Sequence, residues 1–409
     1  MYKVIYSQID PFPKHAPFYA AFNAPHTAFT ETDPAKHKTR RQMLSPSFSR
    51  AGALKLEPVI RQKLTTLDDK IERLLKEGDI DIYPAMRALT TEVIMQFAFG
   101  RSGGMIEENE HNFTSWFSDS LSVASHGFHT MLYNPLARHI GNCLPIPLVT
   151  FMKPDVGKIL SLLKFASESV DYWKESGTDH VEVPVLFDRL TGISRSDMAT
   201  EAVDMIVAGA DTTAMSATVA IVEILTNPTI EGKLVQALDA SIPSRDALPP
   251  LLELEKIEYL NACVKEAIRF TAAVPGRLPR VVPNGKKAFI VENKIIPPGF
   301  PVQTVVSMSA HTMHTSVDAW GPDARSFNPD RWLKPNAKSL EQYQVAFSKG
   351  ARMCLGQNIA PAEITCVLAL LFRKYAVTLA RDFRPPRKVD VFTLEFEAPG
   401  VPIRFTPRS

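Results

Sequence analysis

The sequence has few cysteines and almost no net charge. Only four of its 409 residues are cysteine (Cys143, Cys263, Cys354 and Cys366), too few and too widely spaced for a disulfide framework. We therefore expect reduced thiols in a protein that faces the cytosol. Lys and Arg number 46 against 44 Asp and Glu, which leaves a net charge of +2. A balance so close to neutral gives no strong field to attract nucleic acid, and we expect no nucleic-acid partner.

Long apolar runs and targeting segments are also missing. The first 22 residues contain no apolar core of signal-peptide length. The most apolar stretch, Ala202 to Leu225, is interrupted by Asp204 and Asp211, which favours a buried helix over a membrane span. We therefore predict no transmembrane anchor in this chain, and a soluble or peripherally bound protein. With no repeat or linker either, we expect residues 1–409 to form one domain.

Hydrophobic periodicity predicts a mainly α fold with small β-sheets. Helices are predicted from about Lys36, over 56–75, Leu89–Phe99, 110–180 with proline-broken joints, Ala202–Leu225 and Leu254–Phe270. The first 36 residues read as irregular. Strand patterns occur only late, at Ala288–Val291, Val302–Val306, Val391–Glu397 and Val401–Phe405.

The segment from Phe347 to Gly356, FSKGARMCLG, carries the clearest chemistry. Cys354 stands between Gly350 and Gly356, two residues after Arg352 and just before a predicted helix. A thiolate at a helix N-terminus is stabilised by free N–H groups and by the helix dipole. The glycines let the backbone approach a flat group, and Arg352 can hold an acid on that group. A single thiolate suits haem iron better than zinc, whereas a lone cysteine is more often inert and buried.

Five fixed positions favour the haem interpretation. Phe347, Gly350, Arg352, Cys354 and Gly356 match the FxxGxRxCxG signature, and the chain thereby resembles the cytochrome P450 family. Four further motifs occur in family order: HKTRR at 37–41 resembles WxxxR with His37 for Trp, AGADTT at 208–213 the oxygen-activating helix, KEAIR at 265–269 the ExxR motif, and FNPDRW at 327–332 the PERF-type segment.

The resemblance implies a role for each matched residue. Cys354 would ligate the iron of haem b, and Arg352, Arg280, Arg41 and His37 would contact the haem propionates. Thr212 would hydrogen-bond dioxygen, and Asp211 would help relay protons, with Gly209 permitting a bulge that opens room beside them. Glu266, Arg269 and Arg331 would form a buried structural triad, although Glu266 and Arg269 alone could be a surface pair. His311 and His314 have no third ligand nearby in sequence, and we predict a packing role for them.

The resemblance implies a haem-dependent monooxygenase that inserts one oxygen atom from O2 into a small hydrophobic substrate. The amino-acid sequence around KEAIRFTAAVPGRLPR is similar to that of filamentous-fungal members that oxidise terpenoid or polyketide secondary metabolites. Such members take electrons from NADPH–cytochrome P450 reductase at the endoplasmic reticulum membrane. Two alternatives stay open: a non-catalytic haem-binding remnant, and a haem-thiolate isomerase or dehydratase. Retention of Asp211 and Thr212 favours the monooxygenase over the isomerase.

The early-helix motif already appears at His37, much nearer the start than in the family. We therefore expect the chain to lack the family's N-terminal anchor and first elements, so that late strands such as Ala288–Val291 and Val302–Val306 would lack pairing partners. Unpaired strand edges favour aggregation.

Overall fold

The computed structural model describes residues 2–176, 185–245, 248–283, 289–291, 294–296 and 304–408. Its α-helices are α1 (Tyr2–Ile5), α2 (Ala16–Tyr19), α3 (Pro34–Leu44), α4 (Arg50–Lys55), α5 (Glu57–Leu74), α6 (Ile82–Phe99), α7 (Trp116–Tyr133), α8 (Pro135–Cys143), α9 (Ile146–Met152), α10 (Val156–Ser176), α11 (Arg195–Leu225), α12 (Pro228–Ser241), α13 (Leu251–Leu254), α14 (Glu258–Thr271), α15 (Ala310–His314), α16 (Val317–Trp320), α17 (Ala337–Leu340) and α18 (Ile359–Lys374). Short 3-10 helices are η1 (Ala20–Phe22), η2 (Leu186–Arg189), η3 (Pro329–Leu333), η4 (Gly350–Arg352) and η5 (Leu355–Asn358).

The strands are short and mostly late in the chain. They are β1 (Ile80–Asp81), β2 (Arg280–Val281), β3 (Phe289–Val291), β4 (Lys294–Ile296), β5 (Val305–Val306), β6 (Tyr375–Leu379), β7 (Lys388–Asp390), β8 (Leu394–Phe396) and β9 (Pro402–Pro407). The predicted fold class, mainly α with small sheets, is confirmed. Ala288 and Val302 of the predicted strands lie outside the described residues.

Several helix boundaries differ from the prediction because polar caps decide them. The helix α11 begins at Arg195 rather than Ala202, since the Ser194 hydroxyl accepts the Asp197 amide at 3.1 Å. In the same way Asp81 caps α6, which therefore begins well before Leu89. The predicted helix over Leu254–Phe270 is two helices, α13 and α14, and the first 36 residues include α1, α2 and η1.

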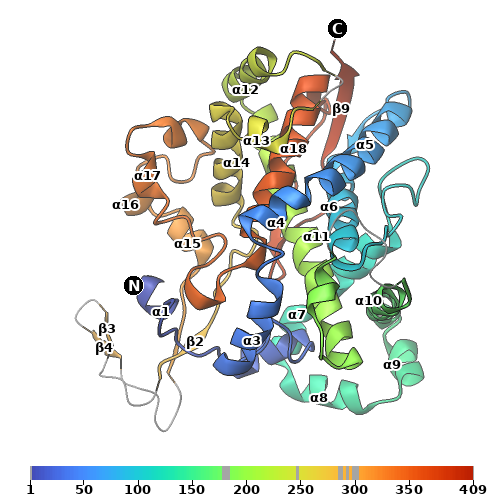
Figure 1. Cartoon of the computed structure of the whole chain (residues 1–409), viewed down its shortest axis with the longest axis vertical. Helices are drawn as coiled ribbons and strands as arrows, with labels where there is room; N and C mark the ends of the chain where they lie inside the picture. Colours follow the sequence, from blue (N-terminus) through green and yellow to red (C-terminus); the bar gives the residue numbers. More distant parts are fainter. Residues whose placement is uncertain are drawn as a thin grey trace.

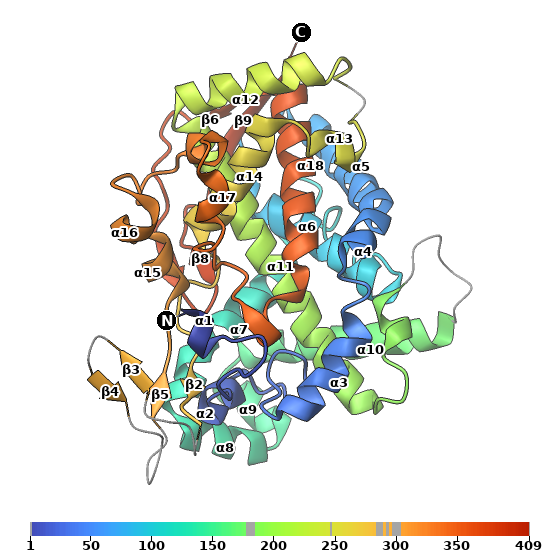
Figure 2. The ribbon, with the colours of Figure 1, turned by 60° about the vertical axis from the view of Figure 1, so that its left-hand side comes forward.

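The long helix α11 runs through the middle of the protein, with α6, α10, α14 and α18 packed around it (Figures 1 and 2). Residues 213–222 of this helix are all buried, which explains why its sequence is apolar over so long a stretch. The main core extends from Leu44 on α3 to Phe405 on β9. The helix α18, which directly follows η5, packs against α11.

The sheets correct one prediction. We expected the strands near 288–291 and 302–306 to lack partners, yet β3 pairs antiparallel with β4 and β5 pairs antiparallel with β2. Both pairs join strands that are close in the sequence, so the early strands that we expected to be needed as partners are not required for them. A three-stranded sheet has the order β1-β9-β6, and β7 pairs with β8.

Two helices in the described part of the chain are long and apolar enough to cross a membrane. They are Arg195–Leu225 and Leu355–Lys374, and 72% and 61% of their most apolar windows are buried in the protein. Such burial is what core helices show, as predicted for Ala202–Leu225.

Candidate active site

The loop that carries Cys354 is held by its own backbone and by the N-terminal segment. The Cys354 amide donates to the Phe347 carbonyl at 2.9 Å, and the Ala351 amide donates to the Ser7 carbonyl at 3.2 Å. Gly350 has φ +75°, and a Cβ there would lie 2.3 Å from the Tyr6 carbonyl oxygen. Only glycine fits this crossing, because any side chain would collide with backbone.

Cys354 directly precedes the short 3-10 helix η5, and the helix predicted after the loop is α18, which starts at Ile359. The Gly356 amide still approaches the sulfur and favours the thiolate, as does the Arg41 guanidinium, whereas burial raises the pKa of the thiol above its usual value. Yet the Cys354 side chain is accessible to solvent.

Basic side chains from separate segments gather beside this loop. From α3, Arg41 donates to the Met353 carbonyl at 2.6 Å, next to Cys354. From the loop itself, Arg352 donates to the Glu31 carbonyl at 2.6 Å. Arg280 on β2 is only 2% exposed and donates to the Tyr19 hydroxyl at 2.6 Å, while its Nε has no hydrogen-bond partner. The structure thus brings together the arginines that the sequence singled out.

Lys14 completes this group, and sequence reasoning missed it. It lies opposite Arg280 in an antiparallel backbone bridge, is 7% exposed, and donates to the Phe29 carbonyl. Its ammonium also lies 4.1 Å from the centre of the Tyr19 ring. No motif surrounds Lys14 in the sequence, so only the tertiary structure could reveal it. We call Lys14, Arg41, Arg280 and Arg352 the cation cluster.

Burial and mutual repulsion disfavour the charged forms in this region. The pKa of Lys14 lies well below its usual value because of burial and then Arg280 and Arg352. Burial and Arg280 lower the pKa of Arg352 to about 10. Burial and Arg352 lower the pKa of the adjacent His37, on α3, to about 3. Two acids, Asp204 and Glu31, act on Lys14, against four basic side chains in the cation cluster as a whole. The cation cluster therefore fits an anionic group with more than one negative charge.

The middle of α11 presents Ala208 and Thr212 with accessible surface, although most of the helix is buried. The Thr212 hydroxyl donates to the Ala208 carbonyl at 2.9 Å. From the sequence we expected Gly209 to permit a bulge in α11, but the structure shows none there. The helix runs unbroken, and a Cβ at Gly209 would lie 2.8 Å from the Ile94 side chain. Glycine is needed there because α6 and α11 approach closely.

The side chain of Asp211, the residue before Thr212, takes part in a buried ion pair. Arg87 on α6 donates to Asp211 Oδ1 from Nε at 2.9 Å and from Nη2 at 2.7 Å, and the Thr393 hydroxyl donates to Oδ2 at 2.7 Å. Sequence reasoning could not find Arg87 as a partner, because it comes from a helix more than a hundred residues earlier.

A cluster of phenylalanines lies next to this ion pair. Phe392 directly precedes Thr393, and its ring is 4.7 Å from Phe22 and 5.1 Å from Phe128. Phe18 and Phe29 extend the same cluster. Phe392 has φ +93°, which a large side chain rarely adopts, and such strain is commonest at functional sites. The region beside Asp211 is thus apolar and aromatic.

Comparisons with known proteins agree with this geometry. The family model for cytochrome P450 matches residues 6–397. The chain belongs to the cytochrome P450 family. Cytochrome P450 monooxygenase claJ of Penicillium crustosum is 29% identical over 88% of this chain and 84% of its own length. Cytochrome P450 monooxygenase tpcC of Cochliobolus heterostrophus is 30% identical over 88% and 69% of the two chains. The chain is accordingly a haem-dependent monooxygenase.

Solved P450 structures show the same fold. The heme domain of cytochrome P450DA superposes with a TM-score of 0.79 at 18% identity, covering 97% of this chain and 84% of the other. The residues present also fit haem. The two propionates of haem carry negative charges that would pair with the cation cluster. The Arg280 Nε, which has no hydrogen-bond partner, can donate to a carboxylate. Cys354, which is accessible to solvent, offers one sulfur ligand.

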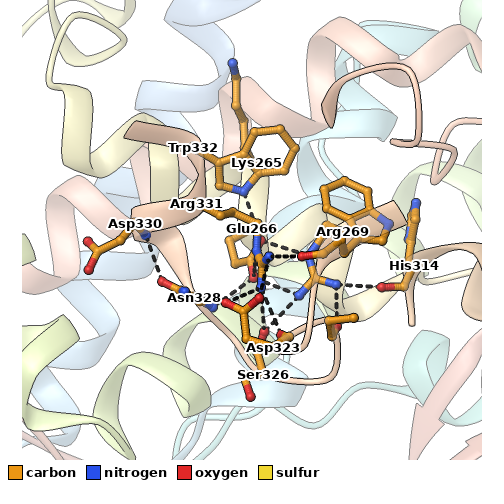
Figure 3. A network of polar contacts seen from close by, with 12 residues as sticks. Lys265, Glu266, Arg269, His314, Asp323, Ser326, Asn328, Asp330, Arg331 and Trp332 are labelled. Atoms are coloured by element: carbon orange, nitrogen blue, oxygen red, sulfur yellow. Dashed lines mark hydrogen bonds and ion pairs between the residues drawn. The ribbon is translucent and has the colours of Figure 1, made fainter. Parts of the chain in front are cut away.

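Behind this site, Glu266 anchors a buried polar network (Figure 3). Its carboxylate accepts from Arg269 at 2.7 and 2.9 Å, from Arg331 Nε at 3.1 Å and from the Trp332 indole at 2.9 Å. Arg269 also donates to the carbonyls of His314, Ala324 and Ser326. Glu266, Arg269 and Arg331 are each at most 3% exposed, so the pair is not a surface one. The network fixes the segment between α15 and η3 against α14.

Of the two histidines for which we predicted a packing role, only His314 is buried, whereas His311 is exposed. His314 is buried and accepts the Val345 amide at Nε2 at 2.9 Å. The described residues contain no group of three or more His, Cys, Asp or Glu side chains that could hold a metal ion. A separate surface hollow of about 580 Å³ between α7 and α10 is lined by Trp116, Lys164 and Phe165 and includes none of the predicted site residues.

Proposed function

We propose that Cys354 ligates the haem iron and that the cation cluster, with His37, holds the haem propionates. One observation carries this assignment: the solvent-accessible Cys354 has Arg41 acting on its thiol, and Arg41 belongs, with Arg352 of the Cys354 loop, to a cluster of four basic side chains. Phe347, Gly350 and Gly356 would shape the loop around the ring. Lys14 joins the four contacts that the sequence resemblance implies.

We assign proton handling to Asp211 and Thr212. When bound, haem supplies the activation of dioxygen and the insertion of one oxygen atom into the substrate. Thr212 would hold a proton at its hydroxyl, which the Ala208 carbonyl accepts in the resting arrangement. Asp211 would resupply that proton from its buried position. The phenylalanine cluster would exclude water from the reacting centre.

The difference spectrum of the reduced protein with carbon monoxide tests the haem assignment. We expect the strongly red-shifted band of thiolate ligation in the wild type, and its loss in Cys354→Ala. Cys263→Ala, which removes a buried thiol elsewhere, should keep the band. A wild type that binds haem without the red shift would refute thiolate ligation and support a non-catalytic remnant.

A hydrophobic secondary metabolite, such as a terpenoid or polyketide intermediate, is the substrate class we propose. The aromatic residues beside Asp211 support an apolar substrate. The similarity to fungal monooxygenases supports a fungal biosynthetic role. Expression in a heterologous fungal host, followed by metabolite profiling against Cys354→Ala, tests this. New oxygenated products confined to polar compounds would contradict it.

Electrons would come from NADPH through cytochrome P450 reductase. The helix α3 exposes Lys36 and Lys38, and the same helix carries Arg41 beside Cys354. An acidic reductase surface could therefore dock close to the haem. NADPH oxidation with purified reductase should be slower in the double variant Lys36→Glu, Lys38→Glu than in wild type at low salt. The difference between the two rates should shrink at high salt, because salt screens the charges. An equal rate at low salt would contradict this docking face.

We propose membrane contact through α8 and α9. These helices lie at the end of the protein opposite the C-terminus (Figures 1 and 2). Tyr133, Leu136, Ile146, Phe151 and Met152 are 59–86% exposed there. Residues 131–154 contain no Asp or Glu. An apolar surface without acidic groups suits an anionic bilayer such as that of the endoplasmic reticulum. Phe151→Asp should reduce co-sedimentation with phosphatidylserine vesicles, and unchanged binding would refute this face.

We also propose that residues 1–409 unfold as one domain. A continuous apolar core joining α3 to β9 supports this. A single cooperative urea transition followed by two probes tests it, and separated transitions would refute it.

A further inference from the structure

Asp211 is the inner end of a charge cluster that reaches the protein surface. Arg87 Nη2, which donates to Asp211, also donates to Glu395 Oε1 on β8 at 2.9 Å. The side chains of Asp211, Arg87 and Glu395 are 1%, 6% and 4% exposed. One guanidinium therefore links two buried carboxylates that come from distant parts of the chain.

The outer end of the cluster is His126 on α7. Its Nδ1 lies 3.2 Å from Glu395 Oε2, and its side chain is 54% exposed. This approach is an ion-pair distance rather than an aligned hydrogen bond, and Glu395 Oε2 is buried without a hydrogen-bond partner. Nδ1 also lies 2.9 Å from the Ser122 carbonyl, which can only accept, so Nδ1 carries a proton. Nδ1 thus donates to Ser122 and lies 3.2 Å from an unsatisfied carboxylate oxygen, to which a small rotation of the imidazole would redirect its proton.

The charges of this cluster do not balance without an extra proton. The charged and titratable groups of this cluster in the described chain are Tyr83 and Arg87 from α6, His126 from α7, Asp211 from α11 and Glu395 from β8, and the neutral Thr393 hydroxyl also donates to Asp211. Burial and then Asp211 raise the pKa of Tyr83, which keeps this phenol neutral. Two carboxylates and one guanidinium leave one negative charge buried. A proton on His126 or on Glu395 removes it.

We propose that His126 and Glu395 form the entry route by which a proton from solvent reaches Asp211. His126 takes up a proton from water at Nε2 and gives the Nδ1 proton to Glu395 Oε2, so that the imidazole ends neutral. Glu395 Oε1 and Asp211 Oδ1 both accept from Nη2 of Arg87, so rotation of the protonated Glu395 carboxyl would bring its proton to the side that faces Asp211, where one water would pass it on. Each transfer moves one proton and changes no oxidation state.

The second carboxylate explains how Asp211 can deliver its proton. A protonated Asp211 no longer needs Arg87 as a counter-ion and can rotate towards Thr212. Arg87 then keeps Glu395 as its partner, so no guanidinium is left buried and unpaired. With Asp211 alone, the same rotation would strand Arg87 in the core. The route rests on the proposed role of Asp211 and Thr212 and extends it to the surface.

Infrared difference spectra between pH 8 and pH 5.5 test the shared proton directly, with haem-loaded protein and no substrate. Wild type should show a protonated-carboxyl band that is absent in Glu395→Gln, whose amide oxygen can still accept from Arg87. His126→Gln should shift or remove the band. His129→Gln, one turn away on α7, should not change it. A band unaffected by both Glu395→Gln and His126→Gln would overturn the proposal.

Oxygen consumption with NADPH and purified reductase gives a second test. The rate in His126→Gln should fall about tenfold at pH 8 and recover towards pH 6, because protons must then come from bulk solvent. Wild type and His129→Gln should lack this pH dependence. The red-shifted carbon monoxide band distinguishes the two failures. Without the band in wild type, the proposed haem function fails. With the band present, an unchanged His126→Gln pH profile overturns the entry route alone.

Discussion

Lys14 and Arg280 face each other across an antiparallel backbone bridge, and both side chains are buried. Two cations so placed repel each other, and each loses hydration. Asp204 and Glu31 offset part of this repulsion, and an anion bound beside the pair would remove more of it. The arrangement therefore commits part of the protein's stability to a bound acidic group.

Lys14→Met should separate these two effects. We expect the haem-free protein to gain about 1–2 kcal/mol, because a buried cation without a full counter-charge is replaced by an apolar side chain. Haem should dissociate faster, because one propionate contact is lost. Urea unfolding of haem-free protein and haem transfer to an acceptor protein measure the two effects. Lys3→Met, at an exposed lysine, should change neither. Equal or slower haem loss from Lys14→Met would contradict the assignment.

Thr212→Ala should retain haem and lose coupling. The hydroxyl that holds a proton is removed, while Cys354 and the cation cluster are untouched. We expect product per oxygen consumed to fall about tenfold, with peroxide released instead. Peroxide release and product formation, measured together, check this. Thr213→Ala, at the neighbouring threonine, serves as the control. An unchanged product yield in Thr212→Ala would count against its proton role.

Glu266→Ala should destabilise the protein by about 3–5 kcal/mol, since it leaves Arg269 and Arg331 buried without their carboxylate. Urea unfolding measures the loss. Glu258→Ala, at an exposed position on the same helix, should cost less than about 0.5 kcal/mol. A small effect of Glu266→Ala would show that the network is not needed for the fold.

Acid should destabilise the protein through His314. Burial and then Arg269 lower the pKa of His314 to about 3. As pH falls from about 6.5 to 3, His314 binds a proton in the unfolded chain but stays neutral in the folded chain. The free energy of unfolding therefore decreases by up to about 1.4 kcal/mol per pH unit. His314→Gln, which keeps an acceptor for the Val345 amide, should reduce this slope. Urea unfolding at pH 7, 6 and 5 measures it, and equal slopes would refute the account.

Local patterns in the sequence were enough for the elements and for the reactive loop. Spacings of three and four predicted α5 and most of α6, because helix periodicity is a property of neighbouring residues. Helix starts were less accurate, since a single cap such as Ser194 moves the boundary of α11 by several residues. Strand pairing was misjudged, because β2–β5 and β3–β4 pair with partners close in the chain instead of the distant early strands that we expected to be needed.

The sequence by itself determined the chemistry of one sulfur in its loop, because the residues around Cys354 are adjacent in the chain. Only the tertiary structure decided what surrounds that loop and α11. Lys14 joined Arg280, and Arg87 and Glu395 joined Asp211, through packing between segments far apart in the chain. Electrostatic interactions act through space, and burial sets their strength. Neither the cation cluster nor the route from His126 can therefore be predicted from the spacing of residues along the chain.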